Sequence, residues 1–219
     1  MYIPAHFSVR DAQEVQKLIR DFPLGALVSY SESGLDANHI PFEVVGGEDE
    51  KFSLIAHVAR ANPLWQILQN QNSSVLVIFK GEDSYISPNW YPSKHATHKQ
   101  VPTWNYRVVH VHGQAKVRED EKFLRGVIGR LTRTHEIATQ QKGVQEHPVW
   151  KMADAEPNYL QQMLQMIVGI EIEVTRIECK FKLSQNRNAE DREGAARALE
   201  AIQHSDMAAR IRQHGVFEN

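Results

Sequence analysis

The sequence predicts an α+β protein that is mainly antiparallel, with a β-barrel core and helices at its periphery. About six or seven β-type segments occur along the chain, and the helical segments gather at the start, the middle and the end. Strands that alternated regularly with helices would instead indicate a doubly wound parallel sheet. Short strands with few crossover helices between them favour an antiparallel barrel.

Size and composition narrow the classes of protein. The chain has 219 residues, enough for one large domain or one domain with an appendage. The formal net charge of -2 predicts no strong bulk attraction to nucleic acid or to membranes. The single cysteine, Cys179, excludes an internal disulfide framework, and the N-terminus lacks a signal-peptide pattern. We therefore expect a cytoplasmic protein in which Cys179 is a buried small residue.

The first half of the chain predicts an edge strand and a capped helix. The expected elements are a helix over 8–21, strands over 24–30, 35–45 and 52–58, turns over 31–34 and 46–51, and a helix from residue 62. Pro41 cannot donate a hydrogen bond to a ladder, so its strand should lie at an edge or carry a bulge. Asn62 followed by Pro63 is a typical helix start, and a new helix N-terminus beside Arg60 could seat a phosphate. An ordinary surface arginine beside a capped helix is the alternative.

The second half is built around a long aromatic region. We expect strands over 75–79, 84–87, 101–113 and 168–183, a turn over 81–83, helices over 119–140 and 157–166, and two short tail helices, with Ala195, Leu199 and Ile202 inward in the first and Ser205 capping the second. Ile177 breaks the alternation of the last strand, which predicts a bend near Thr175 or Arg176. The aromatic segments SPNWYPSK and VPTWNY predict either a ligand site or a packed dimer interface.

Several motifs together resemble one protein family. MYIPAHF, NHIPF, HVARANPLW, VIFKGEDSYISPNWYPSK, VPTWNY, VHVHG and IVGIEIEVTRIECKFKLSQNR occur in this order between Met1 and about Arg192. They resemble the PaiB family of FMN-binding negative transcriptional regulators. The resemblance implies an FMN-binding split β-barrel over 1–187, a small helical tail over 188–219, and a homodimer with the flavin at its interface. Cys179 stands where the family pattern has glycine.

The resemblance also implies a set of FMN ligands. Residues in and after two strands would line the ring and reach the phosphate, namely His39, Ile40, Pro41, Phe42, Ala56, His57, Arg60 and Asn62. Residues of the aromatic region would close one side, namely Ser87, Trp90 and Lys94. The partner subunit would supply Trp104, Lys182, Gln185 and Arg187. These types suit FMN, which needs cations or amides for its phosphate and apolar walls for its ring.

Alternative functions stay open at this point. A flavin-dependent oxidoreductase, similar to flavin reductases or pyridoxamine phosphate oxidases, would need no DNA contact, and spacing identifies no catalytic residue. Binding of DNA by the tail is weakly supported, because its arginines alternate with acidic residues instead of forming a basic stripe. The histidine pairs His95/His98 and His110/His112 lack accompanying carboxylates or cysteines, so no metal site is predicted.

Overall fold

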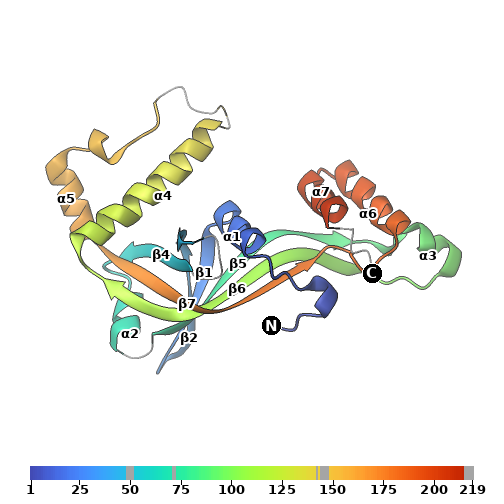
Figure 1. Ribbon diagram of the computed structural model, residues 1–219, viewed down its shortest axis with the longest axis horizontal. Helices are drawn as coiled ribbons and strands as arrows, with labels where there is room; N and C mark the ends of the chain where they lie inside the picture. Colours follow the sequence, from blue (N-terminus) through green and yellow to red (C-terminus); the bar gives the residue numbers. More distant parts are fainter. Residues whose placement is uncertain (48–51, 71–72, 142, 144–147, 215–219) are drawn as a thin grey trace. The chain divides into compact units, whose positions relative to one another are not determined.

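The computed structural model describes residues 1–47, 52–70, 73–141, 143 and 148–214. The predicted turn over 46–51 therefore falls largely outside the described residues. The strands of the protein, shown in Figure 1, are β1 (Leu24–Ser31), β2 (Gly34–Pro41), β3 (Glu43–Gly46), β4 (Phe52–Ala59), β5 (Ser74–Ile86), β6 (Thr103–Arg118) and β7 (Ile167–Lys182). Its helices are α1 (Ala12–Asp21), α2 (Leu64–Asn70), α3 (Pro92–Thr97), α4 (Glu121–Gln141), α5 (Pro157–Gln165), α6 (Ala189–Ala201) and α7 (Ser205–Gln213).

The strands form one seven-stranded sheet in the order β2-β1-β5-β6-β7-β4-β3. β1 is antiparallel to β2 and β5, and β4 is antiparallel to β3 and β7. The predicted fold class, α+β and mainly antiparallel with peripheral helices and a small helical tail, is confirmed. Within the described part of the chain the strand order is open, beginning at β2 and ending at β3, and so not closed into a ring. Pro41 ends the edge strand β2, as its missing N–H predicts.

Two compact units make up the chain. Unit 1 consists of Met1–Val15, Lys80–His110 and Glu178–Asn219, and unit 2 consists of Gln16–Phe79 and Val111–Ile177. Strands β5, β6 and β7 each contribute residues to both units. The predicted division into 1–187 and 188–219 cuts the chain once, whereas each of these units is made of separate segments. That division stays a prediction.

The core of unit 2 lies on one face of β1, β4, β5 and β7. Its fully buried side chains are Leu27, Leu54, Ala56, Val77, Phe79, Ile170 and Ile172. Phe42 joins them, with its ring edge-on to Phe79 at a centroid distance of 5.6 Å. Burial of each large side chain contributes roughly 1.5–3 kcal/mol, so this layer fixes the positions of the strand ends around it.

The start of α1 is set by Asp11, whose Oδ1 accepts a hydrogen bond from the Gln13 amide at 2.8 Å. The helix consequently begins at Ala12 and not at Ser8, where the prediction placed it. Ser8 instead forms an isolated antiparallel bridge with Lys180. The amides of the first helical turn have no acceptor within the helix, and the side chain of the capping residue supplies one. The position of that residue therefore decides where the helix starts.

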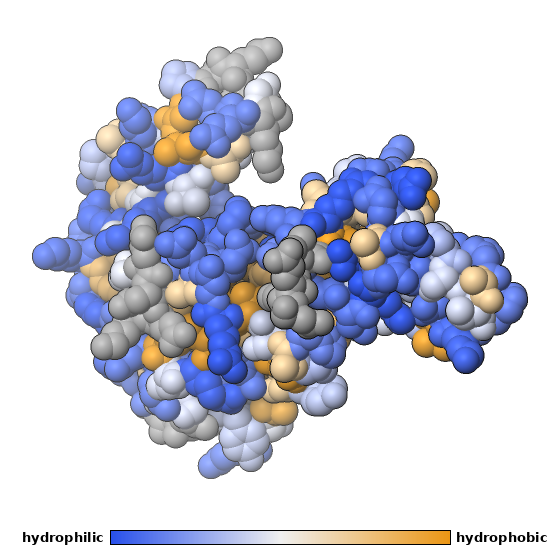
Figure 2. Space-filling model, turned by 45° about the vertical axis from the view of Figure 1, so that its right-hand side comes forward, coloured by the Kyte–Doolittle hydropathy of each residue, from blue (hydrophilic) through white to orange (hydrophobic). Residues whose placement is uncertain are grey.

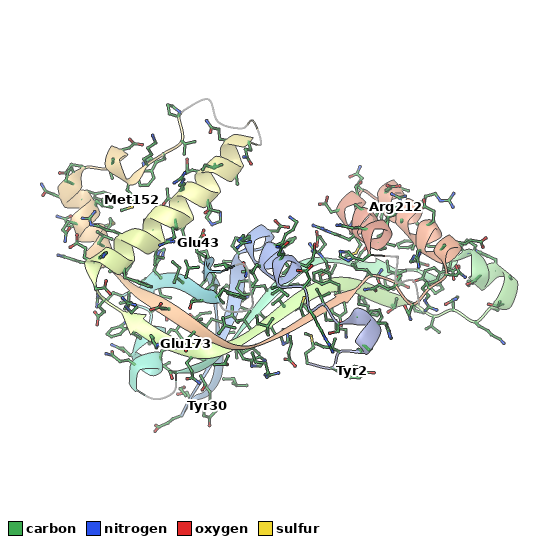
Figure 3. The ribbon with its side chains drawn as sticks, in the orientation of Figure 1. Tyr2, Tyr30, Glu43, Met152, Glu173 and Arg212 are labelled. Carbon is green, nitrogen blue, oxygen red and sulfur yellow. The ribbon has the colours of Figure 1, made fainter. Side chains whose placement is uncertain are left out.

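Helices α6 and α7 pack on each other within unit 1 (Figure 1). Ala195 and Leu199 are fully buried, as predicted, but Ile202 is 50% exposed because α6 ends before it. Residue His204 holds the N-cap position of α7, so Ser205 is the first helical residue and not the cap. Figure 3 labels Arg212 in α7, where it forms ion pairs with Glu193 and Glu200 of α6.

Three predicted boundaries were wrong in the β-rich part. The residues 81–83 continue strand β5, although glycine and acidic residues are typical of turns. The predicted strand over 35–45 is two strands separated at Phe42. No helix was predicted between the strands over 84–87 and 101–113, but residues 92–97 form the short helix α3, which Pro92 starts.

Strand β7 carries the predicted break in alternation. Its buried apolar side chains are even-numbered around Ile170 and Ile172 and odd-numbered at Cys179 and Phe181, although Lys180 between the last two is buried too. The change of parity across residues 173–178 is what the position of Ile177 predicts.

The surface is largely hydrophilic in the view of Figure 2, with apolar side chains reaching it in separate patches. Over the described residues, no helix has both the length and the apolar character needed to cross a bilayer.

Candidate functional site

The predicted ligands on β2 differ in exposure. His39 is exposed, whereas Ile40 and Phe42 are only 4% and 1% exposed. Neighbouring residues of a strand point to opposite faces, and here one face is the core. A ligand at this edge would therefore meet Pro41, the side chain of His39 and the backbone, while Ile40 and Phe42 support it from behind.

Ala56 and His57 lie on opposite faces of β4. Ala56 is fully buried in the core and pairs with Ile170, while His57 pairs with Gly169. The Nδ1 atom of His57 is buried and has no hydrogen-bond partner among the described residues. Burial lowers the pKa of His57, since a charged imidazole would lose its hydration. Burial therefore favours the neutral form of the ring.

Asn62 links the start of α2 to β2. Its Oδ1 accepts a hydrogen bond from the Leu64 amide at 2.9 Å, and its Nδ2 donates to Oδ1 of Asn38 at 2.8 Å. The predicted capping role is thus confirmed. The second bond holds the helix start against the strand residue that precedes His39.

Arg60 donates from each of its side-chain nitrogens. Nε donates to the Gln165 carbonyl at 2.8 Å, Nη1 to Oε2 of Glu119 at 2.7 Å, and Nη2 to the Ile167 carbonyl at 3.2 Å. The guanidinium also lies over the Trp65 ring, 5.8 Å from its centroid. Arg60 could reach a phosphate only by giving up part of this network.

The predicted ligands at residues 87–94 of unit 1 form a local turn. The Ser87 hydroxyl accepts a hydrogen bond from the Asn89 amide at 3.2 Å, and Lys94 Nζ donates to Oδ1 of Asn89 at 2.9 Å. Trp90 is partly buried, and its carbonyl lies so close to Gly194 that a Cβ there would be 2.3 Å away. Ser87 and Lys94 are thus brought together around Asn89.

Lys182 and Trp104 are held together at the ends of β7 and β6. Lys182 Nζ donates to the Trp104 carbonyl and to the Thr103 hydroxyl. The Trp104 ring is 55% exposed and lies edge-on to Tyr85. Burial lowers the pKa of Lys182, and the nearby charges of Lys180 and Arg187 lower it further.

Gln185 and Arg187 follow β7 directly. Gln185 closes a tight turn, since its Oε1 accepts from the Leu183 amide and its Nε2 donates to the Phe181 carbonyl. The Arg187 guanidinium lies over the Tyr91 ring, 5.3 Å from its centroid, which is within the distance of about 6 Å for a cation–π contact. Gln185 positions the backbone, and Arg187 is the side chain that can bind.

Sequence reasoning missed two cations of unit 1. Lys180 is only 8% exposed and lies 5.3 Å from the centroid of the Tyr106 ring. Arg107 is fully buried, donates from Nε to Glu82 at 2.6 Å, and lies over the Phe181 ring. The sequence could have indicated that Arg107 is buried, because Arg107 alternates along β6 with the same period as the buried residues Asn105 and Val109.

The histidines and the cysteine take ordinary positions. Within the described ranges, no group of three or more histidine, cysteine, aspartate or glutamate side chains is placed to hold a metal ion. His112 Nε2 lies 2.9 Å from Nη2 of Arg176, and His95 lies by the Asn89 carbonyl. Cys179 is buried, and burial raises the pKa of its thiol to about 12. Its thiol is therefore unsuited to nucleophilic chemistry.

The residues of the two units meet different needs of FMN. The flavin phosphate needs cations, and the charges of Lys180 and Arg187 both act on Lys182, with no carboxylate among the charges that shift the Lys182 pKa. The Trp104 side chain is 55% exposed, and its carbonyl accepts a hydrogen bond from Lys182 Nζ. The edge strand β2 and the neutral His57 offer polar atoms suited to a ring edge. These residues fit FMN, whereas Arg60 fits only if it leaves Glu119.

The open antiparallel sheet and the residues described above are compatible with a flavin-binding protein. The comparisons agree. Residues 1–176 match the family model described as "Putative FMN-binding domain". The chain is 32% identical over 192 residues to Protease synthase and sporulation protein PAI 2 of Bacillus subtilis, covering 87% of this chain and 85% of that relative. An uncharacterized protein of Aspergillus fumigatus is 31% identical over 239 residues, covering 92% of both chains.

The chain therefore belongs to the FMN-binding family that includes the Bacillus subtilis protein, the PaiB family, which confirms both the resemblance and FMN as the cofactor. Solved structures share its fold at low identity. The conserved hypothetical protein Rv2991 of Mycobacterium tuberculosis superposes with a TM-score of 0.59 at 13% identity, covering 86% of this chain and 94% of that one. The FAD and heme binding protein of Mycobacterium smegmatis gives 0.54 at 16%, covering 80% and 72%.

Proposed function

We propose that the protein is a homodimeric FMN-binding regulator of the PaiB type, in which the flavin is a bound signal. One protomer would contribute His39, Pro41, His57 and Asn62, and its partner would contribute Trp104, Lys182, Gln185 and Arg187. When bound, FMN would supply redox chemistry to this site. The observation that carries the proposal is the position of Lys182 Nζ, which donates to the carbonyl of the exposed Trp104 and is repelled by the charges of Lys180 and Arg187, a repulsion that a phosphate would relieve.

The cations proposed for this site differ in whether they are free to bind the FMN phosphate. Arg60 is held by Glu119 and two carbonyls, so its loss removes a structural contact. Lys182 and Arg187 are the better phosphate ligands, because a charge-assisted hydrogen bond to phosphate is worth more than a neutral one. Ser87, Trp90 and Lys94 would border the ring through the turn around Asn89, and Ile40, Phe42 and Ala56 would support it from the core.

The test is the ratio of FMN affinity to riboflavin affinity, measured by flavin fluorescence quenching. Lys182→Gln and Arg187→Gln should each weaken FMN about tenfold more than they weaken riboflavin, which corresponds to about 1.4 kcal/mol. Arg60→Gln is the control and should change this ratio less. An unchanged ratio in both unit 1 variants would refute the phosphate assignment.

The dimer has its own test. Sedimentation of the FMN-loaded protein should give a mass of two chains, and Trp104→Ala should weaken either the dimer or FMN binding, because an exposed tryptophan is a typical interface anchor. A monomer that binds FMN with full affinity would contradict the shared site.

The regulator part rests on kinship and on the name of the Bacillus subtilis relative, a protease synthase and sporulation protein. Arg212 pairs with Glu193 and Glu200, and Arg210 pairs with Glu82, so these tail arginines are neutralised. Contact with DNA by the tail would therefore need other cations. A shift of promoter DNA by the full-length dimer that weakens steeply with salt supports direct regulation. Oxidation of reduced nicotinamide by the FMN form, without any DNA shift, would favour the oxidoreductase alternative.

A further inference from the structure

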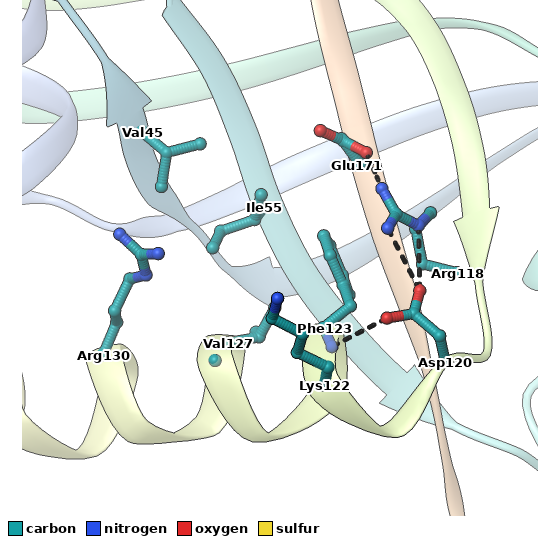
Figure 4. A pocket seen from close by; sticks show the side chains of 10 residues that line it. Val45, Ile55, Arg118, Asp120, Lys122, Phe123, Val127, Arg130 and Glu171 are labelled. Carbon is teal, nitrogen blue, oxygen red and sulfur yellow. Dashed lines mark hydrogen bonds and ion pairs between the residues drawn. The ribbon is translucent and has the colours of Figure 1, made fainter.

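Unit 2 has a pocket on the face of the sheet opposite its core. It lies between α4 and strands β3, β4 and β7, as Figure 4 shows, and we call it the α4 pocket. Its volume is about 380 Å³, within the range of small-molecule sites. It is lined by Val45, Ile55, Arg118, Asp120, Lys122, Phe123, Gly126, Val127, Arg130 and Glu171.

The floor of the α4 pocket is apolar and rigid. Ile55 packs with Val127 and Leu131 in a buried cluster, and Val45 and Phe123 pack against that cluster. This floor is made by strands β3 and β4 and helix α4, which hold side chains more firmly than a loop does. A ligand that rests on it must have an apolar part.

The two carboxylates of the pocket are both paired with one arginine. Arg118 donates from Nη1 to Glu171 at 2.5 Å and from Nε and Nη2 to Asp120 at 3.1 Å. Asp120 also caps α4, since its Oδ1 accepts from the Phe123 amide at 2.9 Å. These bonds lower the pKa of Asp120, so both partners stay ionised and occupied with each other. Glu43 shares this face of the sheet by its pairing with Ile55 but does not line the pocket.

Two further cations of the pocket have no such partner. Neither Lys122 nor Arg130 forms an ion pair in the portion of the chain that the structure describes. They are eight residues apart on α4 with Gly126 midway, so all three lie on one helical face. In Figure 4 both side chains rise from α4 on the side of Val45 and Ile55.

Gly126 leaves room between the two cations. A Cβ placed on it would meet nothing within 4 Å, in contrast to Gly169, where it would lie 2.6 Å from Phe123. Glycine lowers the stability of a helix interior by about 1 kcal/mol relative to alanine, and no packing contact at this position requires it. The helix surface is thus hollowed where an anion could approach its two cations.

We propose that the α4 pocket binds a small organic anion distinct from FMN, with its phosphate or carboxylate between Lys122 and Arg130 and its apolar part on Ile55, Val45 and Phe123. Inorganic anions would lack the contact with the floor, and neutral aromatics would lack the cations. The ligand class is therefore an apolar acid of about the size of a single substituted ring.

The test uses full-length protein saturated with FMN, so that the flavin site is filled, and measures binding by calorimetry and ligand-observed NMR. Phenyl phosphate and benzoate are the probes, and whichever binds more tightly identifies the anionic group. Benzyl alcohol and inorganic phosphate should each bind at least about tenfold more weakly than that probe. Absence of binding for both probes up to about 5 mM, or equal binding of benzyl alcohol, would overturn the proposal.

Variants locate the binding. The double variant Lys122→Gln/Arg130→Gln should weaken the better probe at least about tenfold, and Gly126→Leu should block it by filling the hollow. Arg133→Gln removes one positive charge from the same helix outside the α4 pocket and should leave binding unchanged. Equal effects of Arg133→Gln and of the double variant would contradict the assignment. Loss of FMN affinity in the double variant would show that the pocket belongs to the flavin and would also overturn it.

Discussion

Arg60 and Glu119 form an ion pair with 2.7 Å between Nη1 and Oε2, and it joins the segment after β4 to the residues before α4. Both side chains are partly exposed, at 38% and 47%, so the charge interaction by itself is worth less than about 1 kcal/mol. The two carbonyls that Arg60 also binds make its removal costlier than that of its partner.

We therefore expect Arg60→Ala to lower the free energy of unfolding by about 2 kcal/mol and Glu119→Ala by under about 1 kcal/mol. Urea denaturation of the two variants and the parent measures the difference. Equal losses would mean that the carbonyl contacts contribute nothing. The double variant should lose less than the sum of the two, since the residues interact directly.

The lowered pKa of His57 predicts a loss of stability in mild acid. The folded state resists protonation of this buried ring, while the unfolded chain takes up the proton near pH 6.5. The contribution of His57 to the free energy of unfolding is complete above the pKa of the unfolded chain. It is lost as the pH falls through 6.5 toward the lower pKa of the folded state. Thermal unfolding between pH 7.5 and pH 5.5 should show it, at no more than about 1.4 kcal/mol per pH unit.

Replacing His57 by phenylalanine should flatten this pH dependence. His214, whose pKa burial also lowers, would account for part of the remaining slope. His95→Phe is a suitable control because His95 is exposed. If the control flattens the profile as much as His57→Phe does, the slope has another origin.

Two glycines differ sharply in what a methyl group would meet. At Gly113 a Cβ would lie 2.5 Å from the Glu173 carbonyl oxygen, a backbone atom that cannot move without displacing β7. Gly113→Ala should therefore destabilise the protein by about 1–3 kcal/mol. Gly126→Ala, in the open interior of α4, should stabilise it by about 0.5–1 kcal/mol. Chemical denaturation of the pair checks both signs.

Asp191 is almost fully buried at the start of α6, where it accepts hydrogen bonds from the amide and the hydroxyl of Ser93 at 3.0 Å and 2.6 Å. This carboxylate joins α6 to α3. Asp191→Ala should cost about 2–3 kcal/mol, because it leaves the Ser93 amide without its acceptor, and Ser93→Ala should cost less. If the two variants lost similar free energies of unfolding, the stabilisation by Asp191 would come from its hydrogen bond with the Ser93 hydroxyl alone.

The sequence was sufficient where a residue has one physical role. Pro41 indicated an edge strand or a bulge and lies at the end of an edge strand, Asn62 caps α2, and the change of alternation around Ile177 occurs in β7. Local signals failed where pairing partners decided the outcome, as when residues 81–83 continued β5 against their turn propensity. Strand pairing supplies hydrogen bonds that override weak local preferences.

The ligand residues were less predictable than the fold. Arg60 could be placed beside a helix start, but its commitment to Glu119 depends on a residue 59 positions away. Lys180 was passed over because a buried lysine over aromatic rings leaves no spacing signal. For the α4 pocket a signal did exist, namely two cations and a glycine at intervals of four residues on one helix. This pattern on α4 indicates a pocket only once the strands that α4 packs against are known.

The chain passes from one compact unit to the other at residues 15/16, 79/80, 110/111 and 177/178, three of these within or at the limits of single long strands. No single peptide cleavage can yield either unit as an intact piece, and neither could have been acquired or lost as one continuous gene segment. A relative that lost the whole of β5, β6 or β7 would alter both units at once, so we expect insertions and deletions among homologues to concentrate between strands.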